Sequence, residues 1–245
     1  MGIVRGKNDK IDARRIAKYA EEKQKDLEPS RPLNKTIVEL KELLGLRKRL
    51  VRENVGYKGT ISERKFMKDL KKDDLHIKIL KDKIKSNDKI IKKIELEMFK
   101  LIASDKEMSK NYEFLISIKG IGMVNATMTI AYTENFVAFG NARSYAVYVG
   151  VVPFDYSSGT SIRGRKRVSP LANKELKQEL TQAARSAINH SPEMREYAQR
   201  LNDKNKVYGI ILNNVKFKLI TRMFSVVKRQ ENYVENYDNN YKKTA

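Results

Sequence analysis

The chain contains no cysteine and only two histidines, His76 and His190. Without cysteine it cannot form disulfides, zinc–cysteine sites or thiol nucleophiles, and this composition is typical of a reducing compartment. Two histidines are too few for a metal site built from imidazole ligands, so that class of site is excluded as well.

The chain also lacks long apolar runs. None approaches the roughly 20 residues that a membrane-spanning helix needs, and the N-terminus has no apolar core of a signal peptide. We therefore expect a cytoplasmic protein with no membrane partner.

Positive charge is abundant instead. Lysine and arginine number 51 against 30 aspartates and glutamates, which gives a net charge of +21 and a pI near 9.9. Such an excess indicates a polyanionic partner. A lysine-rich soluble protein from an AT-rich genome would have a similar composition. Because the charge is clustered as well as abundant, nucleic acid is the favoured partner.

Two long helices are predicted over residues 33–103. The first runs from Leu33 to about Val55, where Gly56 and Gly59 are expected to interrupt it. The second carries a heptad seam with one polar position, Asn87, of the kind that fixes the register of a coiled coil. The helices could pair within one chain as a hairpin or between two chains as a dimer. The seam consists of Ile77, Leu80, Ile84, Asn87, Ile91, Ile94, Met98 and Leu101.

A compact helical domain is predicted over residues 112–230, followed by a flexible tail at 231–245. Amphipathic periodicity predicts helices at 175–189 and about 210–229, whereas the valines of 147–152 favour a short strand or a buried turn. The expected fold class is therefore mainly α, with a coiled-coil arm at 33–103 ahead of the compact domain.

Lys119-Gly-Ile-Gly122 predicts a tight turn between two helical segments. The exposed N–H groups of such a turn, at the start of a helix, can bind a phosphate. We therefore treat Lys119, Gly120 and Gly122 as candidate nucleic-acid ligands. A plain corner between helices explains the glycines equally well.

Tyr156-Ser-Ser-Gly-Thr160 has the composition of a turn. A serine hydroxyl that attacks a phosphate needs cations to stabilise the phosphate oxygens, and the planar fork of arginine is suited to this. Passive phosphate contact by the basic residues is the alternative, and both roles are compatible. The basic run that follows comprises Arg163, Arg165, Lys166 and Arg167.

Asp9 and Asp12 stand three residues apart, so on a helix they share a face. Two carboxylates on one face can hold a divalent metal such as Mg²⁺. Acidic residues in the first turn of a helix also complement its macrodipole, and spacing alone favours this second interpretation.

Two separated motifs resemble one family. Residues 7–13, Lys-Asn-Asp-Lys-Ile-Asp-Ala, are similar to the K-x-D-x-x-D-A signature that closes the RuvC-like domain of IS110/IS116/IS902-type transposases and the related Piv invertase. Residues 115–187 resemble the C-terminal domain of these transposases, from the glycine turn through the Ser-Gly pair and basic run to a helix of small residues. The resemblance covers nearly the whole chain.

The resemblance implies a DNA recombinase. Its RuvC-like α/β domain has four acidic residues that bind Mg²⁺; Asp9 and Asp12 match the last two, and residues 1–28 would be the last piece of that domain. Its C-terminal domain supplies a serine that attacks the DNA backbone. Ser158, directly before the glycine, is the best match, and Ser157 is the second choice. This resemblance reverses the preference for capping at Asp9 and Asp12.

The family also implies partners: DNA, in some members a structured guide RNA, and a second subunit at each composite site, for which the coiled coil would serve. The family's earlier acidic residues lie upstream of the motif, whereas Met1 stands eight residues before Asp9. We therefore expect either a fragment of a longer transposase or a truncated copy, and in both cases a chain that is inactive alone. The alternatives are a non-catalytic nucleic-acid-binding and dimerising remnant, and a general helix-hairpin-helix DNA-binding protein.

Overall fold

The structure is a computed structural model that describes residues 8–26, 32, 34–66, 74–153 and 168–235, and the backbone of 157–158 and 162–163. It divides into two compact units, Met1–Leu33 and Asn34–Ala245. The first contains α1 (Asp9–Glu22), which has no buried residue. The second contains α2 (Lys35–Phe66), α3 (Leu75–Ser104), α4 (Lys106–Ile116), α5 (Met123–Thr133), α6 (Ala142–Val149), β1 (Ser157–Ser158), β2 (Ile162–Arg163), α7 (Lys174–His190), α8 (Pro192–Asp203) and α9 (Tyr208–Arg229).

The mainly α fold class is confirmed, because the described strands are the two short segments β1 and β2. The RuvC-like part of the expectation stays a prediction, since 8–26 contains only α1. The domain boundaries expected at 28, 33–103, 112–230 and 231–245 also stay predictions. Across the described residues, no helix is both long enough and apolar enough to cross a membrane.

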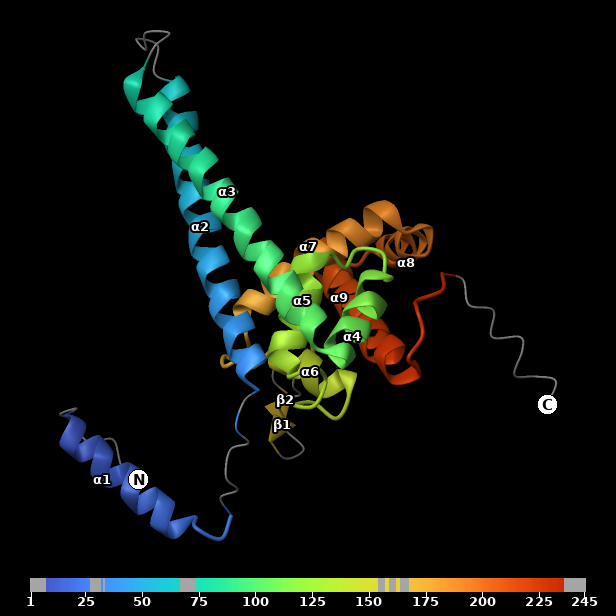
Figure 1. Cartoon of the computed structure of the whole chain (residues 1–245). Helices are drawn as coiled ribbons and strands as arrows, with labels where there is room; N and C mark the ends of the chain where they lie inside the picture. The colour runs from blue at the N-terminus through green and yellow to red at the C-terminus, as the bar shows by residue number, and fades with distance from the viewer. Residues whose placement is uncertain are drawn as a thin grey trace. The chain divides into compact units, whose positions relative to one another are not determined.

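Helices α2 and α3 lie side by side as a hairpin within the chain (Figure 1). Arg47 pairs with Glu95 at 2.8 Å, and Arg64 near the end of α2 pairs with Asp74, the N-cap of α3, at 2.9 Å. Partners that run in opposite directions along the two helices define an antiparallel pair. Of the two arrangements that the sequence allowed, the structure contains the intrachain one.

The predicted seam of α3 is confirmed. Every seam position is buried or half-buried, whereas the intervening positions are mostly exposed. Asn87, 8% exposed, donates from Nδ2 to Oδ1 of Asn54 on α2 at 3.0 Å. The amide of Asn54 in turn donates to Asp88 at 2.8 Å. The polar position is therefore matched across the hairpin, as a register-fixing residue requires.

Replacing Asn87 alone by leucine should destabilise the chain, because the buried Oδ1 of Asn54 then loses its donor. An unpaired buried acceptor costs about 1–3 kcal/mol, whereas replacing both partners by apolar groups is nearly neutral or stabilising. Thermal unfolding should therefore rank Asn87→Leu below both the wild type and the Asn54→Leu/Asn87→Leu double variant. Equal melting temperatures for the single and double variants would contradict this account.

The expected break at Gly56 and Gly59 is wrong, since α2 continues through both glycines to Phe66. Each glycine costs about 1 kcal/mol relative to alanine inside a helix. Packing outweighs that cost, because the C-terminal part of α2 still pairs with α3 and buries Ile61 to 8% exposure. Intrinsic propensity is a weak guide where a partner helix runs alongside.

Helix α9 lies among the other helices of the compact part (Figure 1). The helix confirms the one expected at about 210–229, and its apolar stripe is fully buried: Val215, Leu219, Met223 and Val226. The helix α8 was not predicted, although Ser191 caps it and Pro192 occupies its first turn, a known helix-start pattern. The strand or turn expected at 147–152 is also wrong in part, because α6 continues to Val149.

Candidate active site and nucleic-acid interface

The glycine turn joins α4 to α5, as predicted. Gly120 has a φ of +95°, which favours glycine. A Cβ at this position would stand 2.7 Å from the Ala183 carbonyl oxygen and 2.8 Å from the Ala187 nitrogen, both on α7. Gly120 is therefore required by the close approach of α7, whatever the turn binds.

Gly122 has a different environment. It is the N-cap of α5, it is exposed, and no side chain caps the first N–H groups of the helix. A Cβ there would meet nothing within 4 Å. Lys119 is exposed in the same turn. Because the first N–H groups of a helix have no intrahelical partners, the turn offers backbone donors beside a cation.

The segment that leads to the serines begins at the end of α6. Gly150, with a φ of +76°, ends α6 in the left-handed conformation. The next residue, Val151, is buried, and its carbonyl oxygen accepts a hydrogen bond from Nδ2 of Asn213 on α9 at 2.6 Å. The chain is thus fixed to α9 immediately before it leaves toward β1.

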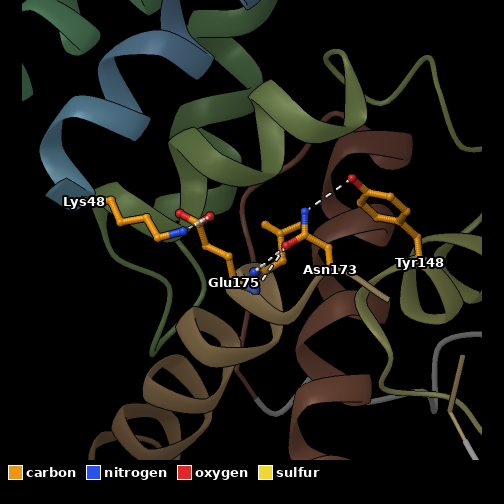
Figure 2. Close-up of polar contacts among 5 residues, drawn as sticks. Lys48, Tyr148, Asn173 and Glu175 are labelled. Carbon is orange, nitrogen blue, oxygen red and sulfur yellow. Dashed lines mark hydrogen bonds and ion pairs between the residues drawn. The ribbon is translucent and has the colours of Figure 1, made fainter. Parts of the chain in front are cut away.

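The return of this segment is fixed at the start of α7. Asn173 is the N-cap of α7 and accepts from the N–H groups of Glu175 and Leu176 at 3.1 Å each. Its own N–H donates to the carbonyl of Tyr148 at 2.9 Å, and its Nδ2 to the Tyr148 hydroxyl at 3.3 Å. Figure 2 shows this junction together with the Lys48–Glu175 ion pair, which joins α7 to α2 at 2.5 Å.

Between these anchors, β1 and β2 form an antiparallel pair. Ser157 lies opposite Arg163, and Ser158 lies opposite Ile162. The sequence indicated a turn at Ser157 and Ser158, and that assignment is wrong for their backbone, which is extended. The backbone pairing brings the serines next to the first arginine of the basic run. Arg165, Lys166 and Arg167 lie outside the described residues.

Asp9 and Asp12 both lie in the first turn of α1, which Asn8 caps by accepting from Ile11 N–H at 3.1 Å. Asp9 is exposed and Asp12 is half-buried. Asp12 lies 3.9 Å from Arg15. No cluster of three or more metal-binding side chains occurs among the residues that the structure describes. The pair belongs to the first unit, whereas the serines belong to the second.

Known protein families match both the region of Asp9 and Asp12 and the region of the serines. A family model described as "Transposase IS116/IS110/IS902 family" matches residues 112–199. A second model, for IS110 transposases of the DEDD type, matches residues 1–94. The chain belongs to the IS110/IS116/IS902 transposase family. The resemblance inferred from the two motifs is therefore confirmed.

The chain is also similar to a protein of Streptomyces coelicolor (strain ATCC BAA-471 / A3(2) / M145) titled "Insertion element IS110 uncharacterized 43.6 kDa protein". The two are 27% identical over 114 residues, which cover 46% of this chain and 28% of the relative. The match therefore spans less than a third of the relative's length, and what the whole relative does is only a proposal for this chain.

Lys216 is a candidate functional residue that sequence reasoning missed. It lies on α9 and is 5% exposed, so its side chain is buried with the apolar stripe. The signal was present, because Lys216 stands four residues from both Leu212 and Ile220, which are buried on the same helix. A lysine inside such an apolar row indicates a buried amine.

Proposed function

We propose that this transposase cleaves and rejoins DNA strands by attack of Ser158 on the phosphodiester backbone. The β1–β2 pairing carries the proposal, because it brings the backbone of the Ser-Ser pair against that of Arg163. The family membership and the net charge of +21 support it. Ser157, directly opposite Arg163, is the second choice for the nucleophile.

The chemistry follows from the residue types. The serine oxygen forms a bond to phosphorus while the bond to the departing sugar oxygen breaks. The serine proton passes to a general base, and the sugar oxygen leaves as a hydroxyl. Charge develops on the phosphate oxygens during this exchange, and arginine stabilises that charge. The serine–phosphate bond replaces the broken phosphodiester bond and keeps its energy. Attack on that phosphorus by a sugar hydroxyl then releases the serine and rejoins a strand.

A Mg²⁺ ion is part of the proposal. Mg²⁺ commonly binds proteins through one or two carboxylates together with substrate phosphates and water, and Asp9 and Asp12 supply two carboxylates on one helical turn. When bound, the ion would polarise phosphoryl oxygens. The donor set fits, and further acidic residues would complete the four that the family implies.

Binding of DNA is assigned to two places. The first is the glycine turn, where exposed Lys119 and the uncapped N-terminus of α5 at Gly122 suit a phosphate. The second is the basic run, which begins with Arg163 at the end of β2. A guide RNA and a second subunit belong to the proposal through the family resemblance, and the α2–α3 arm is the candidate dimerisation element.

Changing Arg163, Arg165, Lys166 and Arg167 together to alanine should weaken DNA binding and its dependence on salt. Each phosphate contact contributes about −0.9 to the slope of log K against log salt on duplex DNA. Fluorescence anisotropy over a salt series measures both quantities. If each residue neutralises one phosphate, the slope should fall by about 3–4.

The control for this change removes the same charge from the arm. Four exposed lysines of α3 serve for it, namely Lys81, Lys83, Lys85 and Lys89. A smaller loss of slope is expected for this variant than for the basic-run variant. An equal loss would show that net charge alone governs binding, and an unchanged slope in the basic-run variant would remove that run from the interface.

A further inference from the structure

A buried amine lies between α7 and α9. The ammonium group of Lys216 has three donors, and one of them reaches Oγ1 of Thr181 on α7 at 3.3 Å. The Thr181 hydroxyl already donates to the Lys177 carbonyl at 2.8 Å, so it faces Lys216 as an acceptor. The other two donors of Lys216 have no partner among the described residues.

A second amine shares this place. Lys177 stands one helical turn before Thr181 and is half-buried, so it borders solvent. No carboxylate of the described residues forms an ion pair with Lys177 or Lys216. Burial, and then the charge of Lys177, lower the pKa of Lys216 to about 8. Two like charges without an acid are costly to bury, and an anion would relieve that cost.

Lys177 lies beside the point where the serine segment begins. A Cβ on Gly150 would be 3.9 Å from Cδ of Lys177. Asn213, three residues before Lys216 on α9, donates to the carbonyl of Val151. Lys177 therefore borders Gly150, and Lys216 follows by three residues the side chain that binds Val151. From these residues the chain continues to β1 and Ser158.

We propose that Lys177 and Lys216 bind a backbone phosphate of the DNA strand that Ser158 attacks. This inference rests on the proposed function. A phosphodiester has one negative charge and two non-bridging oxygens, so it offers an acceptor for each amine. Neither the turn at Gly122 nor the basic run includes these residues, so this is a separate phosphate site. Its role is to position the strand.

DNA is favoured over RNA as the source of the phosphate because Lys177 borders Gly150, where the segment that carries the nucleophile begins. Contact on this side of the serines would fix the strand relative to Ser158. A hydrogen bond to a charged group contributes about 1.5–3 kcal/mol, so losing it should weaken binding on the order of tenfold to a hundredfold.

The first experiment uses inorganic phosphate as the probe and does not depend on DNA. Melting temperatures are measured with phosphate against chloride at equal ionic strength. At tenfold excess over its dissociation constant, phosphate should raise the melting temperature of the wild-type chain by roughly 3–6 °C. Lys216→Met should show a smaller rise, because phosphate can then bind only at the Gly122 turn and the basic run. Lys228→Met, which removes an exposed lysine of the same helix, should keep it.

The second experiment measures anisotropy of labelled duplex DNA over a salt series. Lys216→Met should reduce the salt slope by about 0.9, the value for one phosphate. It should also weaken DNA binding on the order of tenfold to a hundredfold. Lys177→Met is the second variant, because its half-buried side chain tolerates replacement even if Lys216→Met fails to fold. Lys228→Met should retain the wild-type affinity within about twofold.

The outcomes separate this inference from the proposed function. A phosphate-dependent rise of the wild-type size in both lysine variants overturns the site. A rise that needs Lys216 without any change in DNA affinity shows a site for free phosphate and overturns the DNA assignment. A loss confined to RNA of the same sequence overturns the choice of DNA. Absence of DNA binding by the wild-type chain contradicts the proposed function itself.

Discussion

Ser158→Ala is expected to abolish the covalent protein–DNA adduct, by at least about 10³-fold. Alanine has no hydroxyl to attack the phosphate, and water attacking in its place would leave no covalent intermediate. Removal of a nucleophilic side chain therefore lowers the rate of the reaction by a very large factor. The adduct is measured as labelled DNA that stays with the protein on a denaturing gel. Ser157→Ala is the matched control, since it removes the neighbouring hydroxyl one position along β1, and it should at most weaken the adduct.

The assay needs a complete metal site. Asp9 and Asp12 are two carboxylates, and the described residues contain no cluster of three or more metal ligands. We therefore expect the 245-residue chain to form no adduct with Mg²⁺ alone. Adding a family transposase that carries all four acidic residues, with its own serine changed to alanine, should restore the adduct on this chain through a composite site.

Two results would contradict this scheme. An adduct that survives Ser158→Ala but is lost in Ser157→Ala would assign the nucleophile to the residue opposite Arg163. Robust adduct formation by the chain alone would show that two carboxylates suffice. Asp9→Asn/Asp12→Asn in the chain then reports whether this pair takes part, because metal binding requires ionised carboxylates.

Features that depend on nearby residues could be predicted from the sequence. The α3 seam around Asn87 and the α9 stripe repeat every three or four residues, and that repeat predicts the buried face directly. The Ser-Ser pair was recognised because the basic run follows it within a few residues, although its extended backbone was not foreseen.

Features that depend on a residue distant in the sequence could not be predicted. Helix α2 continues through Gly56 because α3 packs against it, and no residue near Gly56 indicates this. The apolar row of α9 marks Lys216 as a buried amine, but its neighbours Thr181 and Lys177 on α7 are known only from the structure. For the same reason, the sequence could not separate the roles of Gly120 and Gly122, which look alike in the motif.

Gly120→Ala is expected to lower the free energy of unfolding by about 2–5 kcal/mol. A non-glycine residue in an unfavourable backbone region costs of order 1–3 kcal/mol, and the φ of Gly120 is +95°. Overpacking adds typically 1–3 kcal/mol. Here the new methyl group would stand 2.7–2.8 Å from three α7 atoms, of which two are backbone. Since backbone cannot rotate aside, α7 must shift from the turn.

The melting temperature should fall on the order of 10 °C, because each kcal/mol corresponds to about 2–4 °C for a chain of this size. Gly122→Ala is the control within the same turn. Its φ of −100° suits any residue and nothing stands within 4 Å of its Cβ, so it should cost no more than about 1 kcal/mol, the loss of a favourable N-cap residue. Equal melting temperatures for the two variants would contradict the packing of the turn on α7. The proposed phosphate contacts would then remain the only reason for a glycine at position 120.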